Sequence, residues 1–214
     1  MKSIKLFFSF LFLLFLQNSH AQSSKEDNPY VKLGQKALID GNFKLAVAHL
    51  EKALPSTQNN PNVLYMLAYS YYHSGEYQKS ISTFGQVINL RPGEVSAYYY
   101  RGKARNVLAT QLNSTLIPAE REKLLLAAVR DYTNAIELNS DDLKLFQNRA
   151  MAYRDYGILK GQKIPKFYDK TAAANAFKSC IADLQHVLDA NPARKDISDE
   201  MKKAKVYLAN LNNK

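Results

Sequence analysis

The sequence has few residues that could cross-link the chain through disulfides or metals. Cys180 is the single cysteine among 214 residues, so no disulfide can form within the chain. The four histidines are scattered without the ligand spacing of a zinc site. We therefore expect no metal, and the stability of the fold has to come from packing. Cys180 is interpreted as a small buried packing residue and not as a reactive thiol.

Signatures of catalysis are also missing. The sequence has no H-E-x-x-H motif and no run of glycines that would cradle a phosphate. His49, His73 and His186 lack the serine, cysteine or carboxylate pattern of a nucleophilic site. Asp142 and Asp196 precede expected helices, where a carboxylate caps free N–H groups. We predict no catalytic residues and no cofactor, and a protein that is not an enzyme.

The apolar run near the start of the chain is too short to span a bilayer. This run, Leu6 to Leu16, follows two lysines and precedes the small residues Ser19 and Ala21, which occupy the two positions read by a signal peptidase. The pattern predicts a signal peptide, residues 1–21, cleaved before Gln22, and a mature protein exported to the periplasm or secreted. A short N-terminal anchor is the alternative.

Acidic residues are fewer than basic ones. The chain has 29 Lys and Arg against 19 Asp and Glu, a formal net charge of +10. For an exported protein this charge favours acidic protein surface, anionic lipid or polysaccharide, and we expect no nucleic acid. The expected partner is a protein or peptide, with acidic partners and association with the envelope or a membrane surface as options. The oligomeric state is left open.

The segment from Leu64 to Pro92 contains two stretches with apolar residues at helical spacing. Gly75 stands where a left-handed residue would end the first helix, and Pro92 stops the second. The apolar positions are Leu64, Leu67, Ala68 and Tyr71 in the first stretch, and Tyr77, Ile81, Phe84 and Ile88 in the second. This pattern predicts a helix-turn-helix hairpin whose apolar side is too large to leave in water, so the unit needs neighbours.

The hairpin recurs with a period of about 34 residues. The places of Leu64, Leu67 and Ala68 are taken by Tyr30, Leu33 and Gly34 upstream, by Tyr98, Arg101 and Gly102 downstream, and by Phe146, Arg149 and Ala150 in a fourth unit. Insertions at about residues 109–122 and 158–172 delay the second helices of the third and fourth units. Pro118 resembles a helix start that would lengthen the third hairpin. A last helical stretch, Ser198 to Leu211, follows without a partner.

On these residues the chain resembles a tetratricopeptide-repeat (TPR) protein. The second unit matches the family pattern almost throughout, whereas Arg101 and Arg149 replace the usual leucine in the third and fourth. The resemblance implies an all-α fold, a right-handed α-solenoid of about four helix-turn-helix repeats with a C-terminal capping helix. The expected divisions are a linker at 22–26, a TPR domain at 27–194 with repeats 27–60, 61–94, 95–142 and 143–194, and a capping helix at 195–214.

Small residues recur where the two helices of each unit should cross, because helices approach closely only where side chains are small. These residues are Gly34, Ala68, Gly102 and Ala150 on the first helices and Ala46, Ser80, Ala128 and Cys180 on the second helices.

In the family the first helices line a concave groove, and the resemblance implies which residues face it. The predicted groove residues are Tyr65, Tyr69, Tyr72, Tyr99, Lys103, Asn106, Lys144, Gln147 and Arg154. Tyrosine presents a rigid ring with a polar tip, and the basic members could pair with acidic side chains or a C-terminal carboxylate. Packing within the fold is the competing interpretation of the tyrosines. Lys144 alone matches the family's clamp for chaperone C-termini, so we do not expect that specificity.

Two functional hypotheses follow. The first is a non-catalytic scaffold or adaptor of the cell envelope that binds a partner segment in the tyrosine-lined groove. The alternative is an envelope-assembly or polysaccharide-associated subunit that uses the convex face and the insertion at 158–172. That insertion is predicted to form a basic loop carrying Lys160, Lys163, Lys166 and Lys170.

Overall fold

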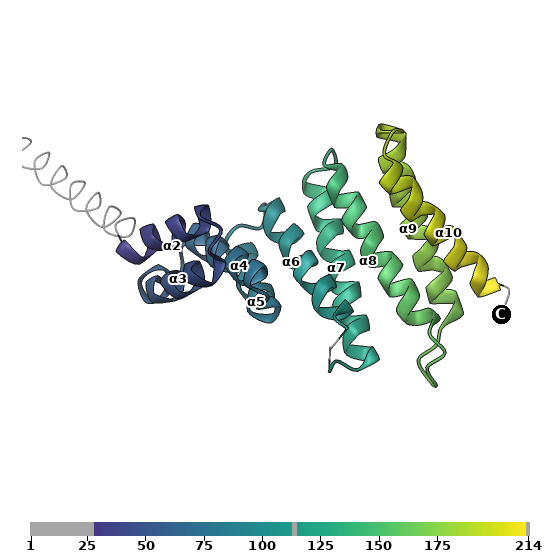
Figure 1. Cartoon of the computed structure of the whole chain (residues 1–214), viewed down its shortest axis with the longest axis horizontal. Helices are drawn as coiled ribbons and strands as arrows, with labels where there is room; N and C mark the ends of the chain where they lie inside the picture. Colours follow the sequence, from purple (N-terminus) through teal and green to yellow (C-terminus); the bar gives the residue numbers. More distant parts are fainter. Residues whose placement is uncertain (1–27, 113–114, 213–214) are drawn as a thin grey trace, which may run out of the picture.

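The computed structural model describes residues 28–112 and 115–212, and this part of the chain is all helical (Figure 1). The helices are α2 Pro29–Ile39, α3 Phe43–Thr57, α4 Pro61–Ser74, α5 Tyr77–Leu90, α6 Val95–Thr110, α7 Pro118–Leu138, α8 Leu143–Gly161, α9 Lys170–Ala190 and α10 Lys195–Asn212. The predicted signal peptide lies outside the described residues. No helix in the described ranges is long and apolar enough to cross a bilayer.

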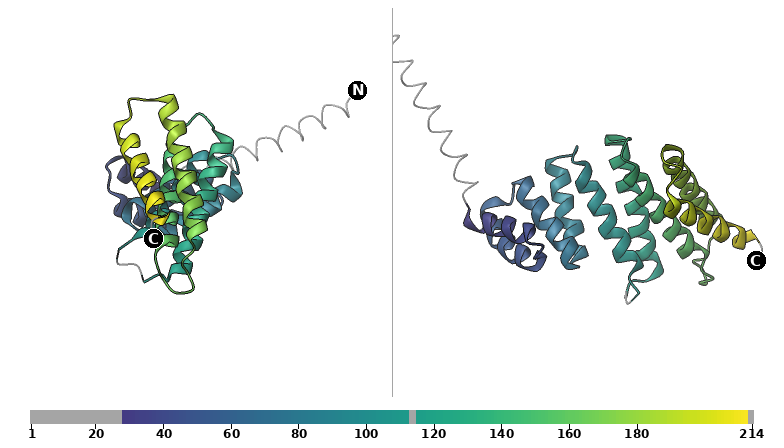
Figure 2. Two further views of the ribbon diagram at one scale, coloured as in Figure 1. Left: turned by 90° about the vertical axis from the view of Figure 1, so that its right-hand side faces the viewer. Right: turned by 45° about the horizontal axis from the view of Figure 1, so that its top comes forward.

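The helices form a row of hairpins that extends along the long axis of the molecule (Figures 1 and 2). The hairpins are α2/α3, α4/α5, α6/α7 and α8/α9, and α10 packs on the last of them. Each helix contacts the helix before and after it, and the first helices of successive hairpins also touch. This confirms the predicted all-α solenoid of TPR-type hairpins.

Local sequence signals start and stop the first two hairpins. The Asn28 and Asn60 side chains accept backbone N–H groups at the starts of α2 and α4, whose first residues are prolines. Gly41 (φ 70°) and Gly75 (φ 86°) follow these helices in the left-handed conformation. Each hairpin can therefore turn within two or three residues.

The two helices of each hairpin cross at small residues, as predicted. Ala46, Ser80, Ala128 and Cys180 are completely buried on the second helices. A Cβ atom added to Gly34 would lie 2.6 Å from Leu50 Cγ, so a larger residue could not fit there without movement. In the second hairpin the Ser80 hydroxyl donates a hydrogen bond to the Ala68 carbonyl oxygen (3.0 Å), which joins the helices directly.

Cys180 has the environment that its position predicted. It lies in the core cluster around Leu184 and Val187. Burial raises the pKa of its thiol to about 12, so the reactive thiolate is suppressed.

Both insertions lengthen their hairpins. Ala109 and Gly157 occupy the places of the turn glycine Gly75, but they lie inside α6 and α8, which continue past them. Pro118 is the first residue of α7, as predicted, and the Glu120 carboxylate accepts the Ile117 backbone N–H (3.0 Å). The extra residues therefore extend helices more than they extend loops.

The loop predicted at 158–172 is shorter than expected, because the flanking helices extend into it. Helix α8 runs on to Gly161 and α9 begins at Lys170, which leaves only residues 162–169 between the two helices. Lys160 consequently belongs to α8 and Lys170 to the first turn of α9.

Buried ion pairs hold the third and fourth hairpins together. Asp131 on α7 accepts hydrogen bonds from Arg101 and Arg105 of α6, with shortest N–O distances of 2.7 and 2.6 Å. Asp183 on α9 accepts two from Arg149 of α8, the shorter at 2.8 Å. Each aspartate is three residues beyond the small crossing residue of its helix. The arginines at the leucine place therefore form internal contacts.

The first two hairpins use other residues at these places. The residues that correspond to the arginine and the aspartate are Leu33 and His49 in the first unit, and Leu67 and Thr83 in the second. Leu67 is almost completely buried, whereas Leu33 is 45% exposed because no preceding helix of the described chain covers it. The pair at these two places thus changes from uncharged to ionic along the solenoid, while the rest of the core stays apolar.

Helix α10 covers one side of the fourth hairpin and exposes lysines together with Val206 and Tyr207 on its other side. Ile197 and Ala204 are buried against α8 and α9. Lys202 and Lys205 of α10 correspond in the repeat to Ala150 and Tyr153 of α8, which pack against α9. Both lysines are exposed to solvent. The helix therefore ends the stack instead of continuing it.

Replacing Asp183 with Asn should lower the free energy of unfolding by about 3 kcal/mol, because Arg149 keeps its charge in a half-buried place without a carboxylate. Chemical denaturation measures this change. The double variant Arg149→Leu, Asp183→Thr installs the pair found in the second hairpin and should recover most of the loss. A single variant as stable as the parent protein would show that the pair does not hold the hairpin together.

Candidate functional site

An aromatic cluster lies on the first helices of the second and third hairpins. It consists of Tyr65, Tyr69, Tyr72 and His73 from α4, Tyr99 and Tyr100 from α6, and Phe43 from α3. Tyr65, Tyr69 and Tyr72 share one face of α4, as the sequence predicted. None of the tyrosines in the cluster is fully buried, so they pack against one another and still present ring surface to solvent.

Tyr100 is the centre of this cluster. Its ring centroid lies 5.0 Å from that of Tyr69, 5.1 Å from Tyr99 and 5.7 Å from Tyr72. Burial is the main cause that raises its pKa, and burial likewise raises the pKa of Tyr65 and of Tyr72. Tyr100 is not among the predicted groove residues. The run of three tyrosines at 98–100 was the signal available.

His73 lies at one end of the cluster. Its ring stacks on Phe43 (4.5 Å between centroids) and lies 4.3 Å from Tyr69. Burial, with the nearby charge of Lys103, lowers the pKa of His73 below its usual value. The imidazole is therefore neutral at pH 7 and behaves as another aromatic ring.

Lys103 extends over the cluster from α6. Its Nζ atom lies 5.3 Å from the ring centroid of Tyr72, 5.4 Å from that of Tyr99 and 5.8 Å from that of Tyr100. These distances are within the range of cation–π attraction. Five of the six predicted groove residues of the second and third hairpins, four tyrosines and one lysine, therefore form one contiguous surface, and Asn106 is not part of it.

Two hollows flank the aromatic cluster at the two ends of α4. One, of about 520 Å³, is lined by residues of α2, α4 and α6, including Gln35, Tyr65 and Ser96. The other, of about 430 Å³, is lined by Phe43 and His73 together with the turn after α2. The first hollow spans the first helices of three successive hairpins, as expected for a groove that runs along the solenoid.

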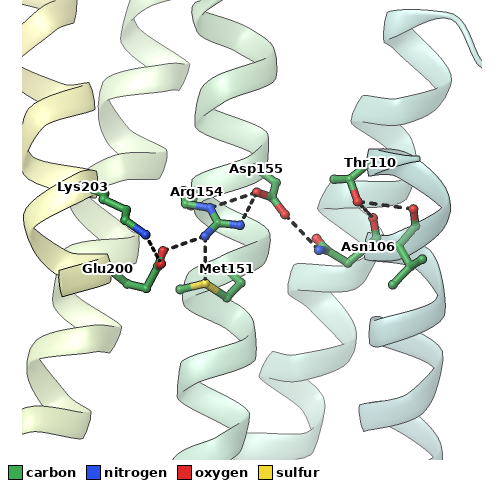
Figure 3. A network of polar contacts seen from close by, with 8 residues as sticks. Asn106, Thr110, Met151, Arg154, Asp155, Glu200 and Lys203 are labelled. Carbon is green, nitrogen blue, oxygen red and sulfur yellow. Dashed lines mark hydrogen bonds and ion pairs between the residues drawn. The ribbon is translucent and has the colours of Figure 1, made fainter. Parts of the chain in front are cut away.

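The predicted groove residues of the C-terminal half have a different role. Arg154 donates to Asp155 (2.9 Å) and to Glu200 of α10 (2.7 Å), and it contacts the sulfur of Met151 (Figure 3). Asn106 of α6 donates to the other oxygen of Asp155 (3.0 Å). The network links α6, α8 and α10, so the charge of Arg154 is already neutralised within the protein.

The two other predicted groove residues of α8 are not part of the network around Arg154. Gln147 accepts a hydrogen bond from Arg194 (3.1 Å). Lys144 is exposed in the first turn of α8.

Lys160 was predicted to lie in a solvated basic loop, and this is wrong. It is 9% exposed, its Nζ atom pairs with Glu122 (3.4 Å), and it lies 4.0 Å from the centroid of the Phe167 ring. Its long side chain reaches across to α7, a contact that depends on both lengthened hairpins. Lys163, Lys166 and Lys170 are exposed. Of the four lysines predicted for the loop, only these three remain available for a basic surface.

Comparison with known proteins gives a repeat-family match and TPR-like folds. Residues 40–108 match the family described as anaphase-promoting complex, cyclosome, subunit 3. Photosystem I assembly protein Ycf3 of Acaryochloris marina is 24% identical over 130 residues, which cover 59% of this chain and 78% of that protein.

Among solved structures, MamA from Desulfovibrio magneticus RS-1 (residue 41 to the end) aligns with a TM-score of 0.58 at 16% identity, covering 86% of this chain and 92% of the other. A second MamA structure aligns with a TM-score of 0.53 at 20% identity, covering 83% of this chain and 89% of the other. At these identities the likeness concerns the fold alone.

Replacing Arg154 with Met should lower the free energy of unfolding by about 2 kcal/mol, because Asp155 and Glu200 lose their shared counter-charge. Replacing Lys203 with Met removes an exposed contact to the same Glu200 (2.7 Å) and should change stability by less than about 1 kcal/mol. Thermal and chemical denaturation compare the two. Equal stabilities would contradict a structural role for Arg154.

Proposed function

We propose that this protein is a non-catalytic scaffold that binds a segment of a partner protein on the aromatic cluster of α4 and α6. The observation that carries the proposal is the cluster itself, in which rigid rings with hydroxyl tips are gathered on first helices and left half-exposed. Such rings give large contact area at a low cost in conformational entropy. Internal packing alone does not require the exposed ring surface.

The fold and the comparisons agree with this class of function. A TPR-type solenoid generally mediates protein–protein interaction, and one relative is described as an assembly protein. The two hollows beside the cluster provide places for side chains of an extended or helical segment.

A pull-down from an envelope extract of the source organism tests the proposal. The triple variant Tyr65→Ala, Tyr69→Ala, Tyr99→Ala should lose the partners that the parent protein retains. Tyr207→Ala is the control, because this tyrosine is 40% exposed on α10, far along the chain from the cluster and outside the basic segment at 163–170. Circular dichroism checks that each variant is folded. A folded triple variant that keeps every partner would refute the groove function.

The basic surface supplies the second candidate, association with the cell envelope. It rests on Lys163, Lys166 and Lys170 together with Tyr168, which is 42% exposed in the same segment. The same pull-down discriminates the two functions when the three lysines are changed to glutamine. Loss of association in that variant, with retention in the tyrosine variant, would favour the envelope function.

Export from the cytoplasm is part of the proposal and rests on the sequence pattern of residues 1–21. The mass of the protein purified from its source should correspond to a chain that begins at Gln22. A mass that includes Met1 to Ala21 would contradict cleavage of the signal peptide.

A further inference from the structure

Lys103 differs from every other half-buried or buried cation in the described part of the chain. Seven other lysines and arginines of the described residues are half-buried or buried, and each has an oxygen acceptor. The acceptors are Asp131 for Arg101 and Arg105, Asp183 for Arg149, Asp155 and Glu200 for Arg154, Glu122 for Lys160, Asp196 for Arg194, and the Ala109 carbonyl for Arg121. Lys103 contacts three tyrosine rings instead.

The rings fix the position of the ammonium group without satisfying it. A lysine ammonium has three N–H donors, and a ring face attracts its charge but offers no lone pair of the strength of a carboxylate. Asp155, a carboxylate on the next first helix, α8, is already shared by Asn106 and Arg154. Lys103 is therefore a pre-positioned cation with unused hydrogen-bonding capacity.

The surroundings favour an anion that arrives on a peptide. Tyr72 and Tyr99 both lie within 5.4 Å of the ammonium group, and their partly exposed rings offer surface to an apolar side chain. The chain as a whole carries a formal net charge of +10, which attracts acidic molecules over long range. An isolated anion would use the lysine but not the rings, whereas an acidic peptide with apolar neighbours would use both.

We infer that Lys103 binds a carboxylate of an acidic peptide segment whose adjacent apolar side chains lie on the tyrosine rings. The inference rests on the proposed function, since it names the chemistry of the partner segment in the same groove. It also assigns the anion contact to Lys103 and not to Arg154, whose charge is used within the fold. A side-chain carboxylate and a C-terminal carboxylate offer the same chemistry, and the experiment separates them.

Three short peptides, labelled with a fluorophore that carries no carboxylate, serve as probes. The first alternates leucine with glutamate and has an amidated C-terminus, so its carboxylates are side chains only. The second alternates leucine with glutamine and has a free C-terminus, and the third is the same glutamine peptide amidated. Fluorescence anisotropy measures their binding to the full chain, to Lys103→Met, to Lys103→Arg, and to Lys178→Met.

Lys178→Met is the control for charge, because Lys178 is exposed on α9 and its loss changes the net charge equally. Lys103→Met should weaken binding of a carboxylate-bearing peptide by about tenfold, whereas Lys178→Met should leave it within about twofold. Lys103→Arg should retain most of the affinity. The amidated glutamine peptide should bind weakly to all four proteins. Whichever of the first two peptides depends on Lys103 identifies the source of the carboxylate.

Three results would overturn the inference: equal loss in Lys103→Met and Lys178→Met, binding of both carboxylate-bearing peptides no tighter than that of the amidated glutamine peptide, or no binding of any peptide. The proposed function can survive each of them. If the pull-down still depends on Tyr65, Tyr69 and Tyr99, the groove binds partners by its rings and only the role of Lys103 fails. If that dependence is absent as well, both fail.

Discussion

The close approach of two helices within each hairpin is the constraint on which the structure depends. It requires a small residue on both helices at the crossing, and this is met in four successive units by pairs such as Gly34 with Ala46 and Ala68 with Ser80. Once the helices are this close, the large residues beside the crossing, such as Leu50 and Phe84, are directed into the core. Without that spacing the first helices would not align to form a common inner surface.

The surface that carries the predicted groove residues has two regions, which differ in the kind of side chain and in the contacts that those side chains make. On α4 and α6 it consists of aromatic rings that retain exposed area around one unneutralised lysine. On α8 and α10 it consists of hydrogen-bonded charges, centred on Arg154, that neutralise one another (Figure 3). Rings can accept a partner without losing internal contacts. The charged network would have to exchange one carboxylate for another, which gives a partner little net gain.

Features encoded by local sequence were predictable, and features that need a distant partner were not. The turn at Gly75, the helix start at Pro118 and the small crossing residue Cys180 depend on neighbours in sequence or on the repeat register. Lys160 was wrongly predicted to be solvated because its neutralising partner, Glu122, lies in the other insertion. The sequence of the two insertions does not indicate that they contact each other. The engagement of Arg154 depends likewise on Glu200 of the capping helix.

The groove tyrosines were found because the repeat register places them on the first helices. Tyr100 was missed because the register marks its place as neither core nor groove, and its central position appears only when α4 and α6 lie side by side. The ion pair of Arg149 was not predicted. The repeat pattern shows that Arg149 replaces the usual leucine, but it does not indicate which acidic residue of the second helix neutralises it. Here a change in one helix is matched by a change in its partner, which a position-by-position comparison does not detect.

That matched change sets a limit on how the protein could be rebuilt. Repeat arrays invite engineering by duplication, deletion or shuffling of modules, on the assumption that any hairpin can follow any other. Here a first helix from the C-terminal half would bring Arg149 opposite Thr83, and the reverse exchange would leave Asp183 opposite Leu67. A chimaera of this chain that is cut within one of these hairpins would therefore leave a charge without its partner.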